Sequence, residues 1–284
     1  MGTYAVTGSA SGMGAQAAQR LRAAGHRVIG VDLKDAEVIA DLSTPSGRAA
    51  AAAAVLDQCD GRLDGAVLAA GVGPLPGVAQ CRLIFEVNYF GVVELARAWR
   101  PALAATGRAK VVVVGSNSTT TTPLVPRRAI RALLADNVDK AFGAVRVFGP
   151  LAPSLAYAAS KIALSRWARR QAVTPQWAGA GIRLNVLAPG AIRTPLLEKQ
   201  LATPREAKAI NAFPVPVGGF GDPGHLGEWI AFMLSDYADF LCGSVIFVDG
   251  GSDAYLRPDD WPRRVPARAL PRYAVKFLAF RRRR

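Results

Sequence analysis

Tyr157 and Lys161 stand four residues apart in the segment Ser154-Leu-Ala-Tyr-Ala-Ala-Ser-Lys161. If this segment is helical, the two side chains lie on one face of the helix. A free phenol titrates at about pH 10, and a neighbouring cation favours the phenolate and lowers its pKa. We therefore expect Tyr157 to exchange a proton with a substrate oxygen, with Lys161 lowering the pKa of the phenol. The pair alone is weak evidence, because exposed helices often carry Tyr and Lys at this spacing.

A glycine-rich turn near the N-terminus is the second chemical signal. The β-rich run Thr3–Thr7 leads into Gly8-Ser-Ala-Ser-Gly-Met-Gly14, and an alanine-rich stretch follows from residue 15. A strand, a glycine turn and a helix in this order let the backbone approach a pyrophosphate, and the helix N-terminus favours its negative charge. The spacing is Gly-x-x-x-Gly-x-Gly rather than the commoner Gly-x-Gly-x-x-Gly. For an isolated motif, an ordinary tight turn is the alternative.

A second strand favours dinucleotide binding at this turn. Residues 27–31 (Arg-Val-Ile-Gly-Val) run directly into Asp32. An acidic residue at this point, about 20 residues after the glycines, binds the ribose hydroxyls in dinucleotide folds. A carboxylate there would also repel a 2′-phosphate, so Asp32 indicates NAD rather than NADP. Lys34, two residues further on, is a basic residue that could bind a 2′-phosphate and so favours NADP.

Apolar, β-rich runs alternate with helical stretches along the chain. We expect strands at residues 3–7, 27–31, 65–69, 110–115, 182–187 and 244–248, and helices near 12–24, 44–58, 78–105, 154–178 and 222–235. This alternation predicts an α/β fold with a Rossmann-like, doubly wound parallel sheet in a single domain. Pro101 is expected to bend or divide the third helical stretch.

Together these features resemble the short-chain dehydrogenase/reductase family in its compact, classical type. Residues 7–14 match its Thr-Gly-x-x-x-Gly-x-Gly motif, and Leu68-Ala-Ala-Gly71 matches its Asn-Asn-Ala-Gly element with both asparagines replaced. Val248-Asp-Gly-Gly251 matches the last strand. The matches keep the family's order from residue 3 to about 251, which makes them specific as a set.

The resemblance implies an NAD(H)-dependent enzyme that interconverts a secondary alcohol and a ketone. Besides Tyr157 and Lys161, its catalytic residues would be Ser116, which bonds the substrate oxygen, and Asn88, which holds a water that relays protons to Lys161. Ser118 is the alternative to Ser116, and a side chain bonded only to backbone is the alternative for Asn88. The implied cofactor-binding residues are Gly8, Ser11, Gly12, Met13, Gly14, Asp32, Asp41, Leu42, Ala70, Gly71, Tyr157, Lys161, Pro189, Gly190, Ile192 and Thr194.

A narrower resemblance concerns the substrate. Residues 31–43, 63–65, 70–74 and 87–91 are similar to the bacterial 3α-hydroxysteroid dehydrogenase/carbonyl reductase subgroup. It implies a 3α-hydroxysteroid or a similar bulky apolar alcohol or ketone. The coniferyl-alcohol dehydrogenases share the long separation of Ser116 from Tyr157, so a coniferyl-like aromatic alcohol or a xenobiotic carbonyl is the alternative. A non-catalytic binding protein is a rival of another class, and the intact catalytic set argues against it.

Two segments of the predicted domain, residues 1–256, lie outside the sheet alternation. The insertion, about 119–153, should carry a helix over Ile130–Phe142 between loops, and the lid, about 191–220, should form short helices at 196–201 and 204–212. Apolar residues of both segments could line a substrate cleft or simply pack the loops onto the body: Leu124, Val125, Leu196, Leu197, Phe213 and Val215.

The insertion also bears on assembly. In the family, helices that flank the Ser–Tyr segment commonly form one of two subunit interfaces. An added element there should cover that interface, so we expect a homodimer, with a homotetramer as the alternative.

Residues 257–284 form a basic C-terminal tail with ten Arg and Lys residues against two acids, a net charge of +8. The other 256 residues have 25 basic and 19 acidic residues, which adds +6 to reach the total of +14. Residues 271–280 are apolar with interspersed cations, and four arginines follow. Anionic lipid attracts such a segment, so peripheral contact at the inner membrane surface is one interpretation. A solvated end, or a tail folded over a subunit interface, is the other.

Composition argues against several other classes of protein. No apolar run reaches the ~18 residues of a membrane span, and we expect no signal peptide. The three cysteines, Cys59, Cys81 and Cys242, indicate reduced thiols in a cytoplasmic protein. The two histidines, His26 and His225, are far apart in sequence, so no metal site is expected. No nucleic-acid motif is present, and nucleic acid is not expected as a partner.

Overall fold

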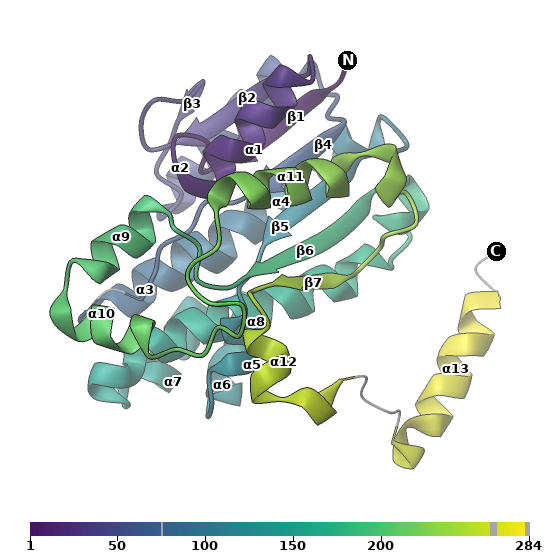
Figure 1. The fold of residues 1–284 in the computed structure, drawn as a ribbon. Coiled ribbons are helices and arrows are strands. Elements are labelled where there is room, and N and C mark those ends of the chain that lie inside the picture. Colours follow the sequence, from purple (N-terminus) through teal and green to yellow (C-terminus); the bar gives the residue numbers. More distant parts are fainter. Residues whose placement is uncertain (75, 262–265, 282–284) are drawn as a thin grey trace.

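Seven parallel strands form one sheet in the order β3-β2-β1-β4-β5-β6-β7 (Figure 1). The computed structural model describes residues 1–74, 76–261 and 266–281. The strands are β1 (Thr3–Thr7), β2 (Arg27–Asp32), β3 (Val38–Ile39), β4 (Gly65–Leu68), β5 (Lys110–Val114), β6 (Arg183–Pro189) and β7 (Val245–Val248). Six of them lie where the sequence predicts a strand, and the two-residue β3 was not anticipated. The central β5 is buried along its whole length, as its unbroken valine run requires.

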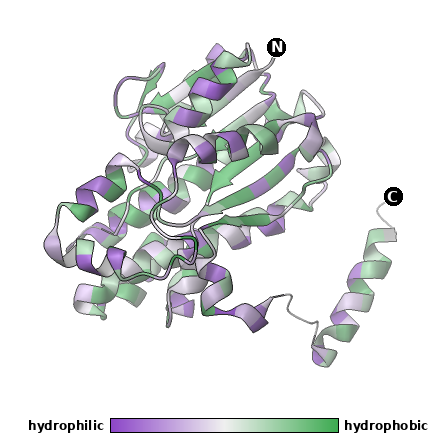
Figure 2. Ribbon diagram, in the orientation of Figure 1, coloured by the Kyte–Doolittle hydropathy of each residue, from purple (hydrophilic) through white to green (hydrophobic). Residues whose placement is uncertain are grey.

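Helices cover both faces of the sheet. On one face α1 (Gly12–Ala23) packs against α11 (Pro223–Leu234). On the other lie α2 (Pro45–Gln58), α4 (Gly91–Ala104) and α8 (Ala152–Ala172), which Figure 1 shows behind the sheet. Each face has its own apolar core, and Figure 2 shows that the strands between them are mainly hydrophobic. The predicted doubly wound α/β fold is therefore confirmed.

The third helical stretch is divided, but Pro101 does not divide it. The stretch consists of α3 (Gln80–Phe85), a π-helical turn η1 (Glu86–Phe90) and α4, which continues through Pro101 to Ala104. Pro101 lies in the last turn of α4, where few residues remain to be disturbed. The expectation that this proline splits the helix was wrong, and the irregularity lies instead at the π-helical turn, which carries Asn88.

Two helices, α6 (Arg127–Leu133) and α7 (Val138–Arg146), replace the single one expected over Ile130–Phe142 in the insertion. The chain reverses at Asp136, whose φ is +53°, and Asn137 then caps the second helix by accepting a hydrogen bond from Lys140 N at 2.9 Å. Both helices pack against α8. The elements between β5 and α8 are α5 (Ser118–Thr121), α6 (Arg127–Leu133), α7 (Val138–Arg146) and the 3-10 turn η2 (Gly149–Leu151).

The predicted lid helices are present as α9 (Pro195–Leu201) and α10 (Pro204–Asn211). The remaining elements are η3 (Ala178–Ala180), η4 (Asp236–Ala238), α12 (Ser252–Leu256), η5 (Pro258–Asp260), η6 (Ala267–Ala269) and α13 (Leu270–Arg281). Figure 1 shows α13 standing apart from the sheet and its helices. In the described part of the chain, no helix has the length and apolar character needed to cross a membrane.

The turn between β1 and α1 brings two backbone segments into close contact. Gly8 and Gly12 have φ values of +70° and +55°, which favour glycine. A Cβ added at Gly14 would overlap the carbonyl oxygen of Gly8, so the first turn of α1 rests directly on this loop. Gly8 N also donates to Val31 O at 2.9 Å, which joins the turn to β2.

We expect Gly14→Ala to destabilise the protein by about 1–3 kcal/mol, because the backbone at Gly8 must move to accept the methyl group. Gly143→Ala is the matched control. Gly143 is exposed within α7 and has open space around the Cβ position, so this change should stabilise by roughly 0.5–1 kcal/mol. Urea unfolding of both variants measures the difference. A Gly14→Ala protein as stable as the wild type would contradict the close backbone contact.

Candidate active site

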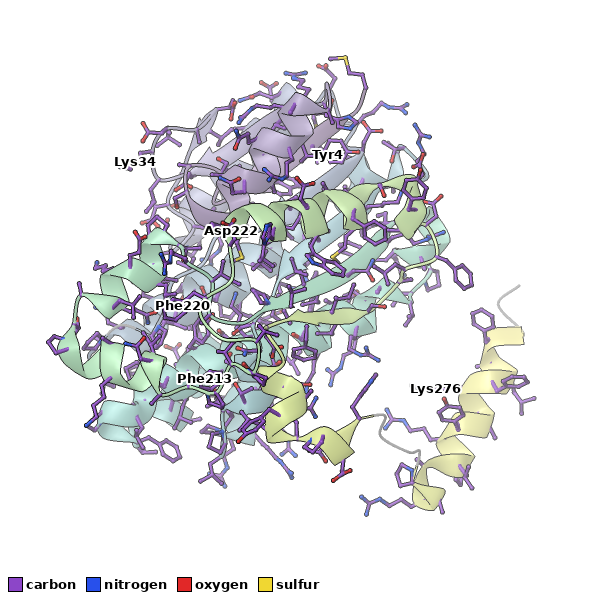
Figure 3. All side chains as sticks on the ribbon, viewed as in Figure 1. Tyr4, Lys34, Phe213, Phe220, Asp222 and Lys276 are labelled. Carbon is purple, nitrogen blue, oxygen red and sulfur yellow. The ribbon has the colours of Figure 1, made fainter. Side chains whose placement is uncertain are left out.

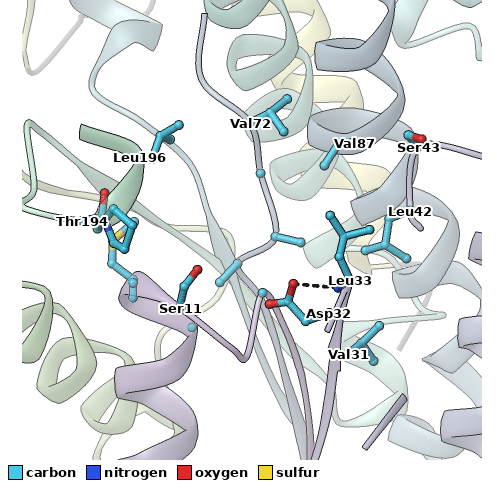
Figure 4. Close-up of a pocket in the computed structure, with 18 of the residues that line it drawn as sticks. Ser11, Val31, Asp32, Leu33, Leu42, Ser43, Val72, Val87, Thr194 and Leu196 are labelled. Carbon is cyan, nitrogen blue, oxygen red and sulfur yellow. Dashed lines mark hydrogen bonds between the residues drawn. The ribbon is translucent and has the colours of Figure 1, made fainter. Parts of the chain in front are cut away.

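A cavity of about 400 Å³ opens at the carboxyl ends of β1, β2 and β4 (Figure 4). Parallel strands bring their carboxyl ends to one edge, and ligands of open α/β sheets bind there. The structure thereby gathers most of the predicted cofactor residues from distant parts of the sequence. Those that line this cavity are Gly8, Ser11, Gly12, Met13, Gly14, Asp32, Asp41, Leu42, Ala70, Gly71 and Thr194.

Backbone amides hold the Asp32 carboxylate at the end of β2. Its Oδ2 accepts from Ala10 N at 2.9 Å and its Oδ1 accepts from Leu33 N at 2.7 Å. The first bond comes from the glycine turn and the second from the residue that follows, so the carboxylate is fixed at the cavity wall (Figure 4). Lys34, which argues for NADP, lies within 3.9 Å of Asp35 and does not line the cavity.

Asp41 and Leu42 form part of the wall next to α2. The Ser43 side chain and backbone amide both bond the Asp41 carboxylate, and these bonds lower its pKa. Thr44 caps α2 by accepting from Gly47 N at 3.0 Å, which fixes where this loop ends. Leu42 is buried and presents an apolar surface to the cavity.

A second cavity, of about 350 Å³, adjoins the first, because Leu196 of the lid lines both. Ser116 and Tyr157 line the second cavity, and Gly190 and Ile192 reach it from the loop after β6. Two of the predicted catalytic residues, Ser116 and Tyr157, therefore lie beside the cavity that most of the predicted cofactor residues line.

Ser116, rather than Ser118, interacts with Tyr157. The Ser116 side chain lies close enough to the Tyr157 phenol to lower its pKa, and its hydroxyl accepts from Ser118 N at 3.1 Å. Within the described residues, the buried hydroxyl of Ser118 has no hydrogen-bond partner. The geometry therefore favours the first of the two serines that the sequence left open.

The pKa of Tyr157 is raised, whereas the sequence argument expected Lys161 to lower it. Burial of the phenol raises the pKa, and the Ser116 hydrogen bond opposes this only in part. Lys161 Nζ donates to Val114 O at 2.9 Å and lies 5.8 Å from the centroid of the Tyr157 ring. Burial also lowers the pKa of Lys161, to about 8, because the ammonium has been removed from water.

Asn88 and Lys161 lie beneath the cofactor cavity rather than in its wall. Asn88 is fully buried in η1, where its Oδ1 accepts from Val72 N at 2.8 Å and its Nδ2 donates to Val72 O at 2.9 Å. These backbone bonds are the arrangement given above as the alternative, and the water relay remains a prediction. A Cβ at Gly71 would lie 3.2 Å from Asn88 Oδ1 and 3.8 Å from Lys161 Nζ, so the three residues are in close proximity.

Pro189, predicted to bind cofactor, lines neither cavity. It ends β6, and its carbonyl accepts from Asn117 N at 2.9 Å, so it connects two loops at the site. Among the apolar residues proposed for a substrate cleft, Leu196, Leu197 and Phe213 do line the second cavity, together with Ile210. Figure 3 labels Phe213 in the segment that follows α10.

The other three proposed cleft residues are elsewhere. Leu124 is 90% exposed, and Val125 packs against the main core instead. Val215 lines a separate cavity with Trp229 and His225. The lining of the second cavity is more polar than expected, and it includes Ser118, Thr121, Thr122, Ser154 and Gln200.

Two supporting residues were missed although they stand in recognised motifs. The hydroxyl of Thr7 accepts from Ala69 N and Ala70 N, both at 3.1 Å, and so ties β1 to the loop after β4. Asp249, in the segment Val248–Gly251, is buried and accepts from Asp253 N at 2.8 Å. Further residues that line the first cavity, and that were not predicted to bind the cofactor, are Val31, Leu33, Ala40, Ser43, Val72, Leu83, Val87 and Pro195. Within the described residues, no group of His, Cys, Asp and Glu side chains could hold a metal ion.

The chain is similar in sequence to known dehydrogenases. Residues 3–125 match the short chain dehydrogenase family, and residues 140–253 match the enoyl-(acyl carrier protein) reductase family. The 3-alpha-hydroxysteroid dehydrogenase/carbonyl reductase of Comamonas testosteroni is 41% identical over 91% of this chain and 99% of its own length. The coniferyl-alcohol dehydrogenase of Pseudomonas sp. strain HR199 is 32% identical over 87% of this chain and 94% of its own.

A solved structure agrees in fold as well as in sequence. The 3-alpha-hydroxysteroid dehydrogenase from Pseudomonas sp. B-0831, complexed with NADH, has a TM-score of 0.85 and 44% identity, and the match covers 91% of this chain and all of the other. The sequence identity extends over nearly the whole length of the chain, and the chain also carries the family's tyrosine, lysine and glycine turn. The chain therefore belongs to the short-chain dehydrogenase family of oxidoreductases.

Proposed function

We propose that this protein is an NAD(H)-dependent oxidoreductase that interconverts a hydroxysteroid, or a similar bulky apolar alcohol, and its ketone. One observation carries the proposal: the cavity that holds Asp32 adjoins the cavity that holds Ser116 and Tyr157. A cofactor and a substrate could thus meet at the tyrosine. The similarity to hydroxysteroid dehydrogenases supports the substrate class, and the apolar lining from Leu197, Ile210 and Phe213 is consistent with it.

The residues of the first cavity fit NAD(H). The N-cap residue of α1, Ser11, makes no side-chain capping bond, so the N–H groups of the first turn can bind a pyrophosphate. Asp32 suits the ribose hydroxyls, and none of the described residues lining the cavity is basic, which supports NAD over NADP. When bound, the nicotinamide accepts or supplies the hydride.

The protein's own contribution is proton transfer at the substrate oxygen. In our assignment Tyr157 exchanges the proton and Ser116 holds the oxygen, while Lys161 binds the nicotinamide ribose and Asn88 supports the proton relay. The raised pKa keeps the phenol protonated at neutral pH, as the reduction of a ketone requires. Oxidation of an alcohol needs the phenolate and should accelerate as the pH rises.

Tyr157→Phe should lower kcat by at least about 100-fold, because the ring remains but can no longer exchange a proton. NADH binding, followed by fluorescence titration, should stay within about twofold of the wild type, since Tyr157 lines the second cavity and not the first. Tyr255→Phe, at a tyrosine that is 66% exposed, is the matched control and should leave both values unchanged.

The assay should follow NAD reduction with 3α-, 3β-, 17β- and 20-hydroxysteroids and with cinnamyl alcohols. Near-normal kcat in Tyr157→Phe would refute the mechanism. Turnover of the cinnamyl alcohols alone would replace the hydroxysteroid with the aromatic-alcohol alternative.

For assembly, we infer a homodimer that uses α11 and the edge strand β7. The inserted helices α6 and α7 pack over α8. This supports the expectation that the insertion covers the subunit interface that such helices form in the family. Arg166 is exposed on α8, and its partial desolvation and the like charges of Arg170 and Arg127 lower its pKa, so this face would repel a second copy. By contrast, α11 and the segment after it expose the aromatic residues Trp229, Phe232, Tyr237 and Phe240.

Phe232→Glu should convert the dimer to a monomer, because a carboxylate would be buried in the apolar interface. Val147→Glu is the control. Val147 is 76% exposed and follows α7, on the side of the molecule where the insertion packs over α8. Light scattering gives the mass of each variant, and melting curves verify that both are folded. A tetramer, or a dimer that persists in Phe232→Glu but dissociates in Val147→Glu, would overturn this assignment.

We further propose that the tail contacts an anionic membrane surface. Arg272 and Lys276 lie one turn apart on α13, while Leu270, Tyr273 and Leu278 are each more than half exposed. Figure 2 shows both kinds of residue along this helix, and Figure 3 labels Lys276 on it, away from the body of the protein. The tail's net charge of +8 would complement anionic headgroups.

The full chain should co-sediment with phosphatidylserine vesicles, and binding should weaken as salt is added, because screening reduces the attraction. A chain that ends at Arg257 should remain in solution and retain its activity. Neutral phosphatidylcholine vesicles serve as the control. Equal sedimentation of the two chains would exclude the anchor and leave the solvated tail as the alternative.

A further inference from the structure

We propose that Arg48 is a positioning residue that fixes two neighbouring segments of the cofactor cavity, the loop at Leu42 and the turn at Val87, relative to each other at its adenine end. The ligand named here rests on the proposed NAD(H) function. Arg48 does not itself line the cavity, and so acts only through the residues that it holds.

Arg48 is a buried cation with an unusual set of partners. It lies in α2 and is only 4% exposed. Its Nε and Nη2 donate to the Glu94 carboxylate at 2.7 and 3.1 Å, which is a bidentate pair. Its Nη1 donates to Glu86 Oε2 at 2.9 Å and to the carbonyl oxygen of Leu42 at 3.2 Å. One guanidinium therefore joins the loop before α2, the π-helical turn η1 and helix α4.

Two of these partners belong to neighbouring segments that line the cavity. Leu42 lines it from the loop that precedes α2, and Val87, which follows Glu86 directly in η1, lines it from the helical turn. Figure 4 labels Leu42 and Val87 at the same end of the cavity, near Asp32. Because the same nitrogen of Arg48 bonds the Leu42 carbonyl and Glu86, it limits how far the two segments can move apart.

Direct packing supports this arrangement. A Cβ added at Gly91, where α4 begins, would lie 3.4 Å from Leu42 Cβ, so this end of α4 approaches the loop closely. The guanidinium also lies 5.9 Å from the centroid of the Phe90 ring, at the end of η1. The loop and the helical turn are thus in contact around Arg48, and their relative placement depends on it.

The chemistry of the contact requires arginine. A planar guanidinium can hold a carboxylate with two nitrogens and still direct another N–H to a carbonyl, whereas an ammonium is a compact point charge without this fixed geometry. Arg48→Lys should keep the positive charge between Glu86 and Glu94 but lose the bond that reaches Leu42.

The test separates adenosine binding from nicotinamide binding. Arg48→Lys should raise the Kd for NADH and for ADP-ribose at least about fivefold, since a charge-assisted bond at the wall is lost. The KM for nicotinamide mononucleotide, which lacks the adenosine, should stay within about twofold, and so should kcat at saturating NAD. Arg97→Lys is the matched control, because Arg97 forms an exposed ion pair with Asp136 and should change none of these values.

Glu86→Gln is a second, milder variant if Arg48→Lys does not fold. The amide keeps the size of the side chain but weakens the bond to Arg48, so ADP-ribose binding should decline in the same direction with a smaller effect. Equal weakening of NADH and nicotinamide mononucleotide, or a lower melting temperature with unchanged Kd for ADP-ribose, would overturn the inference. Failure of the wild type to bind NADH would instead contradict the proposed function.

Discussion

The packing of α8 on the sheet, along β6, determines the geometry of the whole site. Ala156, Ala159 and Ala163 are fully buried in this helix, and their small side chains let it lie near the sheet. Lys161 is buried as a result, and its ammonium reaches the last carbonyl of the neighbouring strand β5, that of Val114, at 2.9 Å. Tyr157, one turn earlier, interacts with Ser116, two residues beyond the end of β5. The position of one helix on the sheet thus places three of the four proposed catalytic side chains.

The parts of the structure that were predicted are those that a short, contiguous stretch of sequence determines. Valine runs such as 111–114 can only be strands buried on both faces, and the glycine turn after Thr7 must precede a helix. Both kinds of signal are contiguous in sequence, and the sheet order then brings their ends together. The lid helices were also predicted, and each begins with a proline, Pro195 or Pro204, at the first helical position, where proline is tolerated.

The features that were missed depend on three-dimensional burial. The sense of the pKa shift at Tyr157 could not be obtained from its spacing to Lys161, because removal from water outweighs a charge that is directed elsewhere. The break at Asp136 depends on a positive φ that few residues adopt, and the π-helical turn at Asn88 carries no strong sequence signal. The role of Arg48 is visible only once Leu42, Glu86 and Glu94 are seen around it.

Burial of Lys161 also links the site to the stability of the protein. Its pKa falls from 10.5 to about 8 on folding, so the folded state binds this proton less tightly than the unfolded state does. The destabilisation is therefore fully present below about pH 8, and it diminishes as the pH rises toward 10.5. A shift of this size corresponds to roughly 3 kcal/mol at neutral pH. The packing of α8 and the apolar cores on both faces of the sheet must offset that amount, because the same burial holds the cation beneath the cofactor cavity.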